Sequence, residues 1–435
     1  MCHPPIGASI GIYEEEQAQE ADMERGATES VRNTKVRTGT AQQGITGKVR
    51  GVAALAALAA SAMAAVATAA PGAEATTQPV AVPVPLTSSP SDGATDIRTE
   101  IPVSVTAQSG EKLAAVTLAG PDGRAVPGSL NADGTVWTAG GRLRTKTHYT
   151  LSATGVAADG TEATRQSSFT TFVPAADKTL KFAATDPADG DTVGVGMPIM
   201  VQFSKPVTDR AAVERSLKVV SNPPQTGHWS WLSDARLDWR PQSYWQPGTK
   251  VQVHLELDGV PAGADKYGGA DTSFGFTVGR SQISVVDLDK HRMTVFQGGN
   301  TVETIPVTGG KPGADTWGGI MAVIDKSPSV HMQSSTVGFG NEYDIPDVRY
   351  AIHLTYSGTY IHAAPWSVGS QGWANVSHGC VGLSMGRAAW LFENTLPGDI
   401  VQVLNSPKSV APGNGFGDWQ ESWPQWLAGS AVKAS

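Results

Sequence analysis

The stretch Tyr360–Ser384, YIHAAPWSVGSQGWANVSHGCVGLS, contains one of the two cysteines of this 435-residue chain, Cys380, together with two histidines. His378 precedes the cysteine by two positions and His362 precedes it by eighteen. The other cysteine is Cys2, near the N-terminus. A lone thiol with two imidazoles close to it in sequence indicates a nucleophile rather than a disulfide framework.

A helix is predicted directly behind the cysteine. The segment SMGRAAWLFENTLPGD places Ser384 as an N-cap, carries good helix formers through Asn394, and stops at Pro397 and Gly398. We therefore expect Cys380 on a loop that leads towards a helix start. The helix dipole and the free N–H groups there lower the pKa of a thiol.

The sequence around this helix predicts strands. From Arg280 onward the runs ISVVDLD, GIMAVID and YAIHLTY, and DIVQVL after the helix, alternate between apolar and polar residues and are joined by turn residues. Residues 280–405 are thus predicted to form a mostly β unit with one short helix.

An internal repeat precedes this unit. SPSDGATDIRTEIPVSV, from Ser89, is echoed by DPADGDTVGVGMPIMVQF, from Asp186, and each copy ends on a similar strand, SSFTTF or TSFGFTVG. Residues 89–175 and 178–279 are therefore predicted to be two immunoglobulin-like β-sandwiches. The junction FTVGRSQISVV has no proline or charge block, so we expect the second sandwich to pack rigidly on the unit that follows and the first sandwich to be hinged.

The N-terminal region is predicted to carry an export signal. Residues 52–70 are apolar and Ala-rich, follow a basic flank and precede small residues in A-x-A spacing, with cleavage after Ala69 or Ala75. The apolar run is also long enough for an uncleaved membrane anchor. Residues 1–75 are predicted to carry no fold, and residues 76–88 form a Pro/Thr/Ser linker.

Composition excludes some functions. The net charge is −8 and no cluster of Lys or Arg invites nucleic acid. The tail, residues 406–435, is rich in tryptophan, and we expect Trp419, Trp423 and Trp426 to pack it onto the last module rather than to bind sugar.

The residue types around the cysteine suit nucleophilic catalysis. An imidazole that takes the thiol proton holds the thiolate in an ion pair, and either His362 or His378 could do so. Gly379 and Gly382 leave room for backbone amides to face a substrate oxyanion. Zinc would need a fuller ligand set, and no C-x-x-C or H-E-x-x-H motif occurs, so no metal and no cofactor are predicted.

These motifs resemble the L,D-transpeptidase (YkuD-like) catalytic domain. The resemblance rests on H…SHGC with its gap of eighteen, the flank APWSVG, and the aliphatic-x-aliphatic-Ser that follows. It extends from Ile283 to Val403 and into the tail GFGDWQESWPQWLAG. Actinobacterial members are similar in architecture: an export signal or anchor, two immunoglobulin-like modules, then a catalytic β-sandwich with a short helix behind the cysteine loop.

The resemblance implies roles for individual residues. Cys380 would be the acyl-accepting nucleophile, His362 the general base and acid, and His378 the histidine that orders the loop. Gly379 and Cys380 would supply N–H donors to the oxyanion, and Tyr343 and Met332 would lie on a mobile flap. The implied substrate-binding set is Met332, Tyr343, Gly358, Ala363, Trp366 and Ser377.

Four departures from the family pattern stand out. Ala363 replaces a serine after the base histidine, which is a minor loss if the backbone carbonyl makes the contact. Gly382 replaces the usual Asn or Arg and bears on acceptor binding or rate. Trp373 is a further difference, as is a flap one residue longer before Tyr350.

By the same resemblance the chain is an exported cell-wall enzyme that acts on peptidoglycan stem peptides. The thiol attacks a tetrapeptide stem, D-Ala leaves, and the side-chain amine of another stem accepts the acyl group to form a 3→3 cross-link. Carbapenem-type β-lactams would acylate the same thiol, and only the N-terminal apolar segment would contact a membrane. An L,D-carboxypeptidase or other hydrolase on the same fold, and an inactive wall-binding scaffold, remain alternatives.

Overall fold

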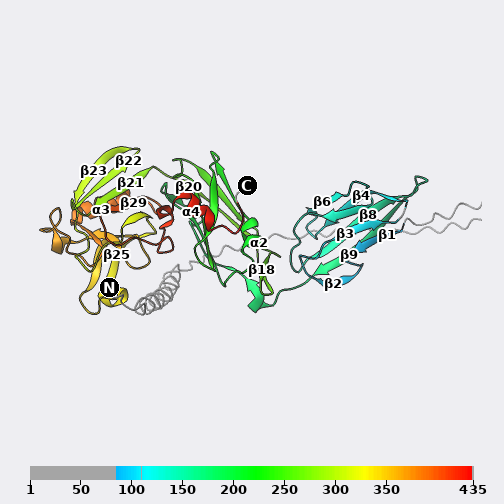
Figure 1. The fold of residues 1–435 in the computed structure, drawn as a ribbon, viewed down its shortest axis with the longest axis horizontal. Coiled ribbons are helices and arrows are strands. Elements are labelled where there is room, and N and C mark those ends of the chain that lie inside the picture. The colour runs from blue at the N-terminus through cyan, green and yellow to red at the C-terminus, as the bar shows by residue number, and fades with distance from the viewer. Residues whose placement is uncertain (1–84, 109, 434–435) are drawn as a thin grey trace, which may run out of the picture. The chain divides into compact units, whose positions relative to one another are not determined.

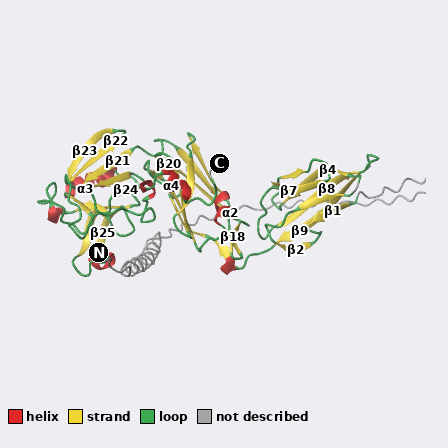
Figure 2. Ribbon diagram, in the orientation of Figure 1, coloured by secondary structure: helices red, strands yellow, loops and turns green. Residues whose placement is uncertain are grey.

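The structure is a computed structural model that describes residues 85–108 and 110–433. Strands dominate every part of it (Figure 2), so the predicted mostly β fold class is confirmed. The predicted export signal lies outside the described residues. Within those residues, no helix has the length and hydrophobicity that a bilayer crossing requires.

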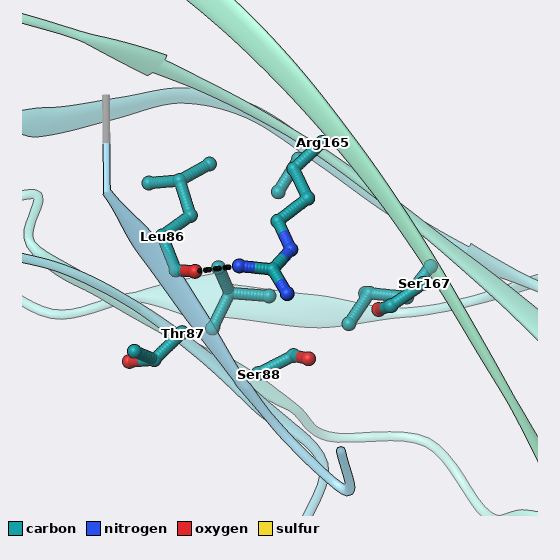
Figure 3. Close-up of a pocket in the computed structure, with 8 residues that line it drawn as sticks. Leu86, Thr87, Ser88, Arg165 and Ser167 are labelled. Carbon is teal, nitrogen blue, oxygen red and sulfur yellow. Dashed lines mark hydrogen bonds between the residues drawn. The ribbon is translucent and has the colours of Figure 1, made fainter. Parts of the chain in front are cut away.

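The first sandwich consists of two sheets with strand orders β1-β3-β7-β6 and β2-β9-β8-β4-β5 (Figure 1). Its strands are β1 Leu86–Ser89, β2 Ala94–Ile97, β3 Ser104–Ala107, β4 Lys112–Ala119, β5 Ala125–Val126, β6 Gly128–Leu130, β7 Val136–Ala139, β8 His148–Val156 and β9 Glu162–Thr171. The sandwich thus begins at Leu86, inside the predicted linker 76–88, because the Leu86 side chain is buried in its core. A small pocket beside β1 is spanned by Arg165, whose Nη1 donates to the Leu86 carbonyl at 2.8 Å (Figure 3).

The second sandwich has the orders β11-β13-β16-β15 and β12-β20-β17-β14, with a small sheet β10-β19-β18 beside them. Its elements are η1 Ala176–Lys178, β10 Thr179–Leu180, β11 Phe182–Asp186, β12 Thr192–Val193, β13 Ile199–Phe203, α2 Arg210–Arg215, β14 Leu217–Asn222, β15 Gly227–Trp231, β16 Arg236–Pro241, β17 Lys250–Leu255, β18 Pro261–Gly263, β19 Lys266–Gly268 and β20 Thr272–Val278. In β17 buried and more exposed residues alternate, and Val251, Val253 and Leu255 are the fully buried ones.

The internal repeat extends to topology and packing. Strands β1, β3, β7 and β6 of the first sandwich correspond in order to β11, β13, β16 and β15 of the second. A side chain on Gly128 in β6 would enter the Trp137 ring, and one on Gly227 in β15 would enter the Trp239 ring. In both copies the tryptophan lies two residues before the partner of the glycine across the strand pair. The same packing of a glycine against a tryptophan ring on the neighbouring strand thus occurs in both sandwiches.

The third unit pairs a five-stranded sheet, β23-β22-β21-β29-β24, with a four-stranded sheet, β25-β26-β27-β28. Its elements are β21 Gln282–Asp287, β22 Arg292–Gln297, β23 Asn300–Pro306, β24 Gly319–Ala322, β25 Lys326–Gln333, η2 Ser334–Val337, β26 Asp344–His353, β27 Tyr360–Ala363, η3 Pro365–Ser367, β28 Val381–Leu383, α3 Met385–Asn394 and β29 Ile400–Leu404. Helix α3 begins after Ser384, as predicted, and packs on β26 and β27 through Ala388 and Leu391.

The C-terminal tail contains η4 Asp418–Gln420 and α4 Trp423–Ala428. The Arg240 guanidinium of β16 lies 4.7, 5.4 and 4.8 Å from the ring centroids of Trp419, Trp423 and Trp426. The three rings therefore contact the second sandwich, while η4 packs on β24 of the third unit. The expectation that the tail packs onto the last module was thus incomplete, because the Arg240 guanidinium attracts the aromatic rings to the second sandwich as well.

Candidate active site

Pairing of two short strands brings the cysteine and a histidine to one face of a sheet. Strand β27 runs parallel to β28, with Ile361 opposite Val381 and His362 opposite Gly382. Cys380 precedes Val381 and so lies beside Tyr360. Because alternate residues of a strand share a face, the side chains of Cys380 and His362 project to the same side.

The imidazole of His362 is held in one tautomer. Its Nδ1 lies 2.9 Å from the carbonyl oxygen of Ala363, to which it donates. The ring is 6% exposed, and its burial lowers the pKa of His362, although the contact with Ala363 opposes this shift. Trp366, 57% exposed, covers it with a ring centroid separation of 5.9 Å. Nε2 is left as the basic nitrogen.

The thiol of Cys380 is protonated in these surroundings. Its Sγ donates to the carbonyl oxygen of Gly358 at 3.6 Å. Burial raises the pKa of Cys380 to about 11, and a backbone hydrogen bond from Tyr360 lowers it only in part. The expected lowering by a helix start was wrong, because β28 separates the cysteine from the first residue of α3, Met385.

The loop before the cysteine is closed by a serine. Ser377 Oγ donates to the Cys380 carbonyl at 2.6 Å and accepts from the Gly379 N–H at 3.1 Å. Gly379 has φ +123°, a conformation that side-chain-bearing residues rarely adopt. In this conformation the Gly379 N–H is therefore engaged by Ser377 rather than directed at a substrate.

A flap, defined here as residues 334–343, connects β25 to β26. Ser334, fully buried, ties it together: its Oγ donates to the carbonyl of Tyr343 and accepts from the Tyr343 N–H, both at 3.0 Å. Met332 is half-buried on β25, opposite Ile345 of β26. The flap is thus a compact loop at the end of a β-hairpin.

The flap lies against the cysteine loop, defined here as residues 377–380. A side chain on Gly358, which has φ +91°, would come within 2.6 Å of Val337 in the flap. The Tyr343 ring is 5.0 Å from the His378 ring, and Phe339 is 5.7 Å from the same imidazole. Burial, with a smaller contribution from Cys380, raises the pKa of Tyr343 to about 12.

His378 faces the flap rather than the thiol. Its Nε2 lies 2.6 Å from Glu342 Oε2 and 2.9 Å from Lys311 Nζ. Sequence reasoning missed both partners, because Lys311 in GGKPG and Glu342 in NEYD are ordinary surface residue types in turn-rich segments. Only the folded chain brings them to the cysteine loop.

The two departures next to the reacting groups have structural explanations. Ala363 keeps the contact with His362 through its backbone carbonyl. At Gly382, a Cβ would come within 2.9 Å of both the Ala364 Cβ and the Thr308 Cγ2. Thr308 also pairs with Gly382 through backbone hydrogen bonds in both directions, so this chain fills the space from the neighbouring segment.

Two other histidines of the third unit have structural partners. His353 contacts Asp325 and stacks on Tyr360, and His331 contacts Asp344 on the same hairpin. In the part of the chain that the structure describes, no group of three His, Cys, Asp or Glu side chains is arranged to hold a metal ion.

Known proteins match this chain along most of its length. Residues 281–403 match the family model of the L,D-transpeptidase catalytic domain, and residues 94–261 match that of a bacterial Ig domain. L,D-transpeptidase 2 of Mycobacterium tuberculosis is 40% identical over 351 residues, 80% of this chain and 85% of that protein. L,D-transpeptidase 5 of the same species is 35% identical over 357 residues, which are 80% of this chain and 77% of the length of that protein. A solved structure of an L,D-transpeptidase in complex with imipenem is 39% identical, covers 51% of this chain and 98% of that chain, and has a TM-score of 0.45.

Proposed function

The chain belongs to the L,D-transpeptidase family, and we propose that it cross-links peptidoglycan stem peptides by acyl transfer through Cys380. The pairing of β27 with β28 carries this proposal. It sets the thiol and the imidazole of His362 on one face of the sheet, with Nδ1 of the imidazole already engaged. A nucleophile and an oriented base are what covalent acyl transfer requires.

In the first step His362 Nε2 takes the thiol proton while Sγ attacks the carbonyl carbon before the terminal D-Ala of a tetrapeptide stem. The C–N bond breaks, Nε2 returns the proton to the leaving amine, and a thioester remains. The raised pKa of Cys380 and the lowered pKa of His362 support proton transfer during the attack rather than a resting ion pair.

In the second step the side-chain amine of another stem attacks the thioester. His362 takes a proton from the amine and returns it to sulfur, which leaves with the thiol regenerated. The product is a 3→3 cross-link. Water in place of the amine would give the hydrolytic products of an L,D-carboxypeptidase.

The other residues have supporting roles in this proposal. The N–H groups of Cys380 and Gly379 stabilise the oxyanion, the latter once Ser377 releases it. Tyr343 and Met332 cover the donor stem, Gly358 forms the floor, and Trp366 lines the mouth. Ser377 contacts substrate at the site's edge, and His378 orders the loop. Ala363, predicted to bind substrate, is 1% exposed and instead acts through its carbonyl contact with His362.

The location follows from the substrate. Peptidoglycan lies outside the membrane, so residues 52–70 act as an export signal or anchor. Residues 89–175 and 178–279 are spacer modules and residues 280–405 the catalytic domain. The tail is residues 406–435. We also propose that carbapenem-type β-lactams acylate Cys380.

The mass of the intact protein after exposure to a carbapenem tests this function. We expect wild type and Cys2→Ser to gain the mass of one carbapenem, and Cys380→Ala to gain none. A tetrapeptide stem with an amine acceptor should then give a cross-linked dimer. An adduct on Cys380→Ala would overturn the mechanism, and tripeptide without dimer would identify a hydrolase.

A further inference from the structure

Three ionisable side chains from separate segments meet where the flap touches the cysteine loop. Lys311 follows β23, Glu342 belongs to the flap, and His378 lies two residues before the nucleophile. Glu342 Oε2 is 2.6 Å from His378 Nε2 and 3.1 Å from Lys311 Nζ. One carboxylate oxygen therefore bridges the ammonium group of Lys311 and the imidazole of His378.

The distances restrict how the proton is placed. A nitrogen that donates to Glu342 has no lone pair left for Lys311, so His378 Nε2 carries a proton and Lys311 donates to Glu342 instead. Both contacts lower the pKa of Glu342, which stays ionised. Glu342 thus sets the tautomer of His378, with the proton on Nε2.

The backbone of Lys311 is hydrogen-bonded to the cysteine loop. Its backbone N–H donates to the Ser377 carbonyl at 2.8 Å, and Gly310 bridges to Ser377. Glu342 is therefore the flap residue whose charge links the flap to Lys311 and the cysteine loop. The neighbouring flap contacts, from Phe339 and Tyr343 to His378, are ring contacts without charge.

We propose that Glu342 is a positioning residue, which holds the flap closed over Cys380 by bridging Lys311 and His378. The inference rests on the proposed function, because it assigns the closed flap to the acylation step. When the flap closes, it holds Tyr343 and the Nε2-protonated His378 next to Cys380, and when it opens, it admits the substrate.

The size of the effect follows from exposure. The side chains of Glu342 and Lys311 are 49% and 42% exposed, so their ion pair contributes weakly and is screened by salt. Loss of the bridge should shift the ratio of closed to open flap by about three- to tenfold.

Kinetics of carbapenem acylation on the full chain test the proposal. Glu342→Gln should lower the acylation rate constant at saturating carbapenem about three- to tenfold, with an unchanged melting temperature, and Glu342→Asp should restore part of it. Sodium chloride should slow wild type towards the Glu342→Gln value and leave that variant unaffected. Asp344→Asn is the matched control, because it removes an exposed carboxylate that contacts His331 on the same hairpin.

A second readout does not depend on activity. In ¹⁵N spectra of the histidine rings, Glu342→Gln should change the Nε2-protonated signal of His378, and Asp344→Asn should not. Unchanged His378 signals together with wild-type acylation and salt dependence would overturn the role of Glu342. If wild type were not acylated at all, the proposed function would fail, while the spectra would still test the bridge.

Discussion

At the scale of single residues, burial decides the protonation state of Cys380 and His362, the proposed reacting pair. The thiol of Cys380 donates to the Gly358 carbonyl, and burial raises its pKa although a backbone hydrogen bond from Tyr360 opposes this shift. His362 is buried, and its pKa is lowered for the same reason. Both groups are therefore neutral at rest, since burial disfavours charge on either one.

This state predicts how the thiol responds to pH. A thiol whose pKa is raised to about 11 gains thiolate about tenfold per pH unit up to that value. The rate of Cys380 alkylation by iodoacetamide in a Cys2→Ser background should therefore rise about tenfold per unit from pH 7 to 10. Quenched samples read by mass spectrometry would measure it. A plateau below pH 8 would instead indicate a resting thiolate–imidazolium pair.

At the scale of elements, the tail and strand β16 are joined by buried polar groups. Arg236 of β16 binds Asp238 through two hydrogen bonds, at 3.0 and 2.6 Å, and donates to the carbonyls of Gly413 and Gly415 in the tail. Asp418 of η4 is fully buried near this pair. Burial and the Asp238 carboxylate raise the pKa of Asp418, so Asp418 is the protonated partner.

The two aspartates should respond differently to the same substitution. Asp418→Asn resembles the protonated acid and should leave the melting temperature at neutral pH unchanged or higher. Asp238→Asn leaves the buried Arg236 guanidinium without its carboxylate partner and should lower the free energy of unfolding by about 3 kcal/mol. Thermal unfolding would measure both, and equal losses would contradict the assignment of the proton.

The sign of the pH dependence follows from the same assignment. Because the folded-state pKa of Asp418 is raised, the native state holds more protons than the unfolded one between the two pKa values. Its contribution to stability is therefore present at low pH and is lost as pH rises through that window. Asp418→Asn should remove this loss.

At the scale of the whole molecule, the second sandwich and the third unit share one core. The buried cluster of residues 180–278 continues into Ile324, Ile400, Phe416 and Trp419. Trp419 Nε1 also donates to the Gly196 carbonyl at 2.7 Å. The first sandwich has a separate core, which supports the expected rigid pairing of the other two; its hinge stays a prediction.

Truncated fragments test this shared core. A fragment that begins at Thr179 should keep full carbapenem acylation and the stability of the third unit. One that begins at Arg280 exposes several buried side chains, each worth about 1.5–3 kcal/mol, and should melt at least about 10 °C lower. Scanning calorimetry and acylation rates would measure both. Equal values for the two fragments would show that the second sandwich is only a spacer.

The sequence alone determined whatever depends on neighbouring residues. Alternation within runs such as VQVHLEL predicted strands, Ser384 and Pro397 bounded a helix, and the repeat predicted two sandwiches. The thiol of Cys380 and its spacing from His362 predicted the proposed reacting pair, because those residue types have few other uses in a chain that is predicted to be exported.

Tertiary structure alone decided what depends on contacts between distant segments. Burial raises the pKa of Cys380. Arg240 contacts the ring of Trp426 in the tail, although the two residues are far apart in sequence. Glu342 reaches His378 across 36 positions. Local periodicity encodes an element and its buried face, but the free energies of burial and ion pairing appear only when the elements pack together.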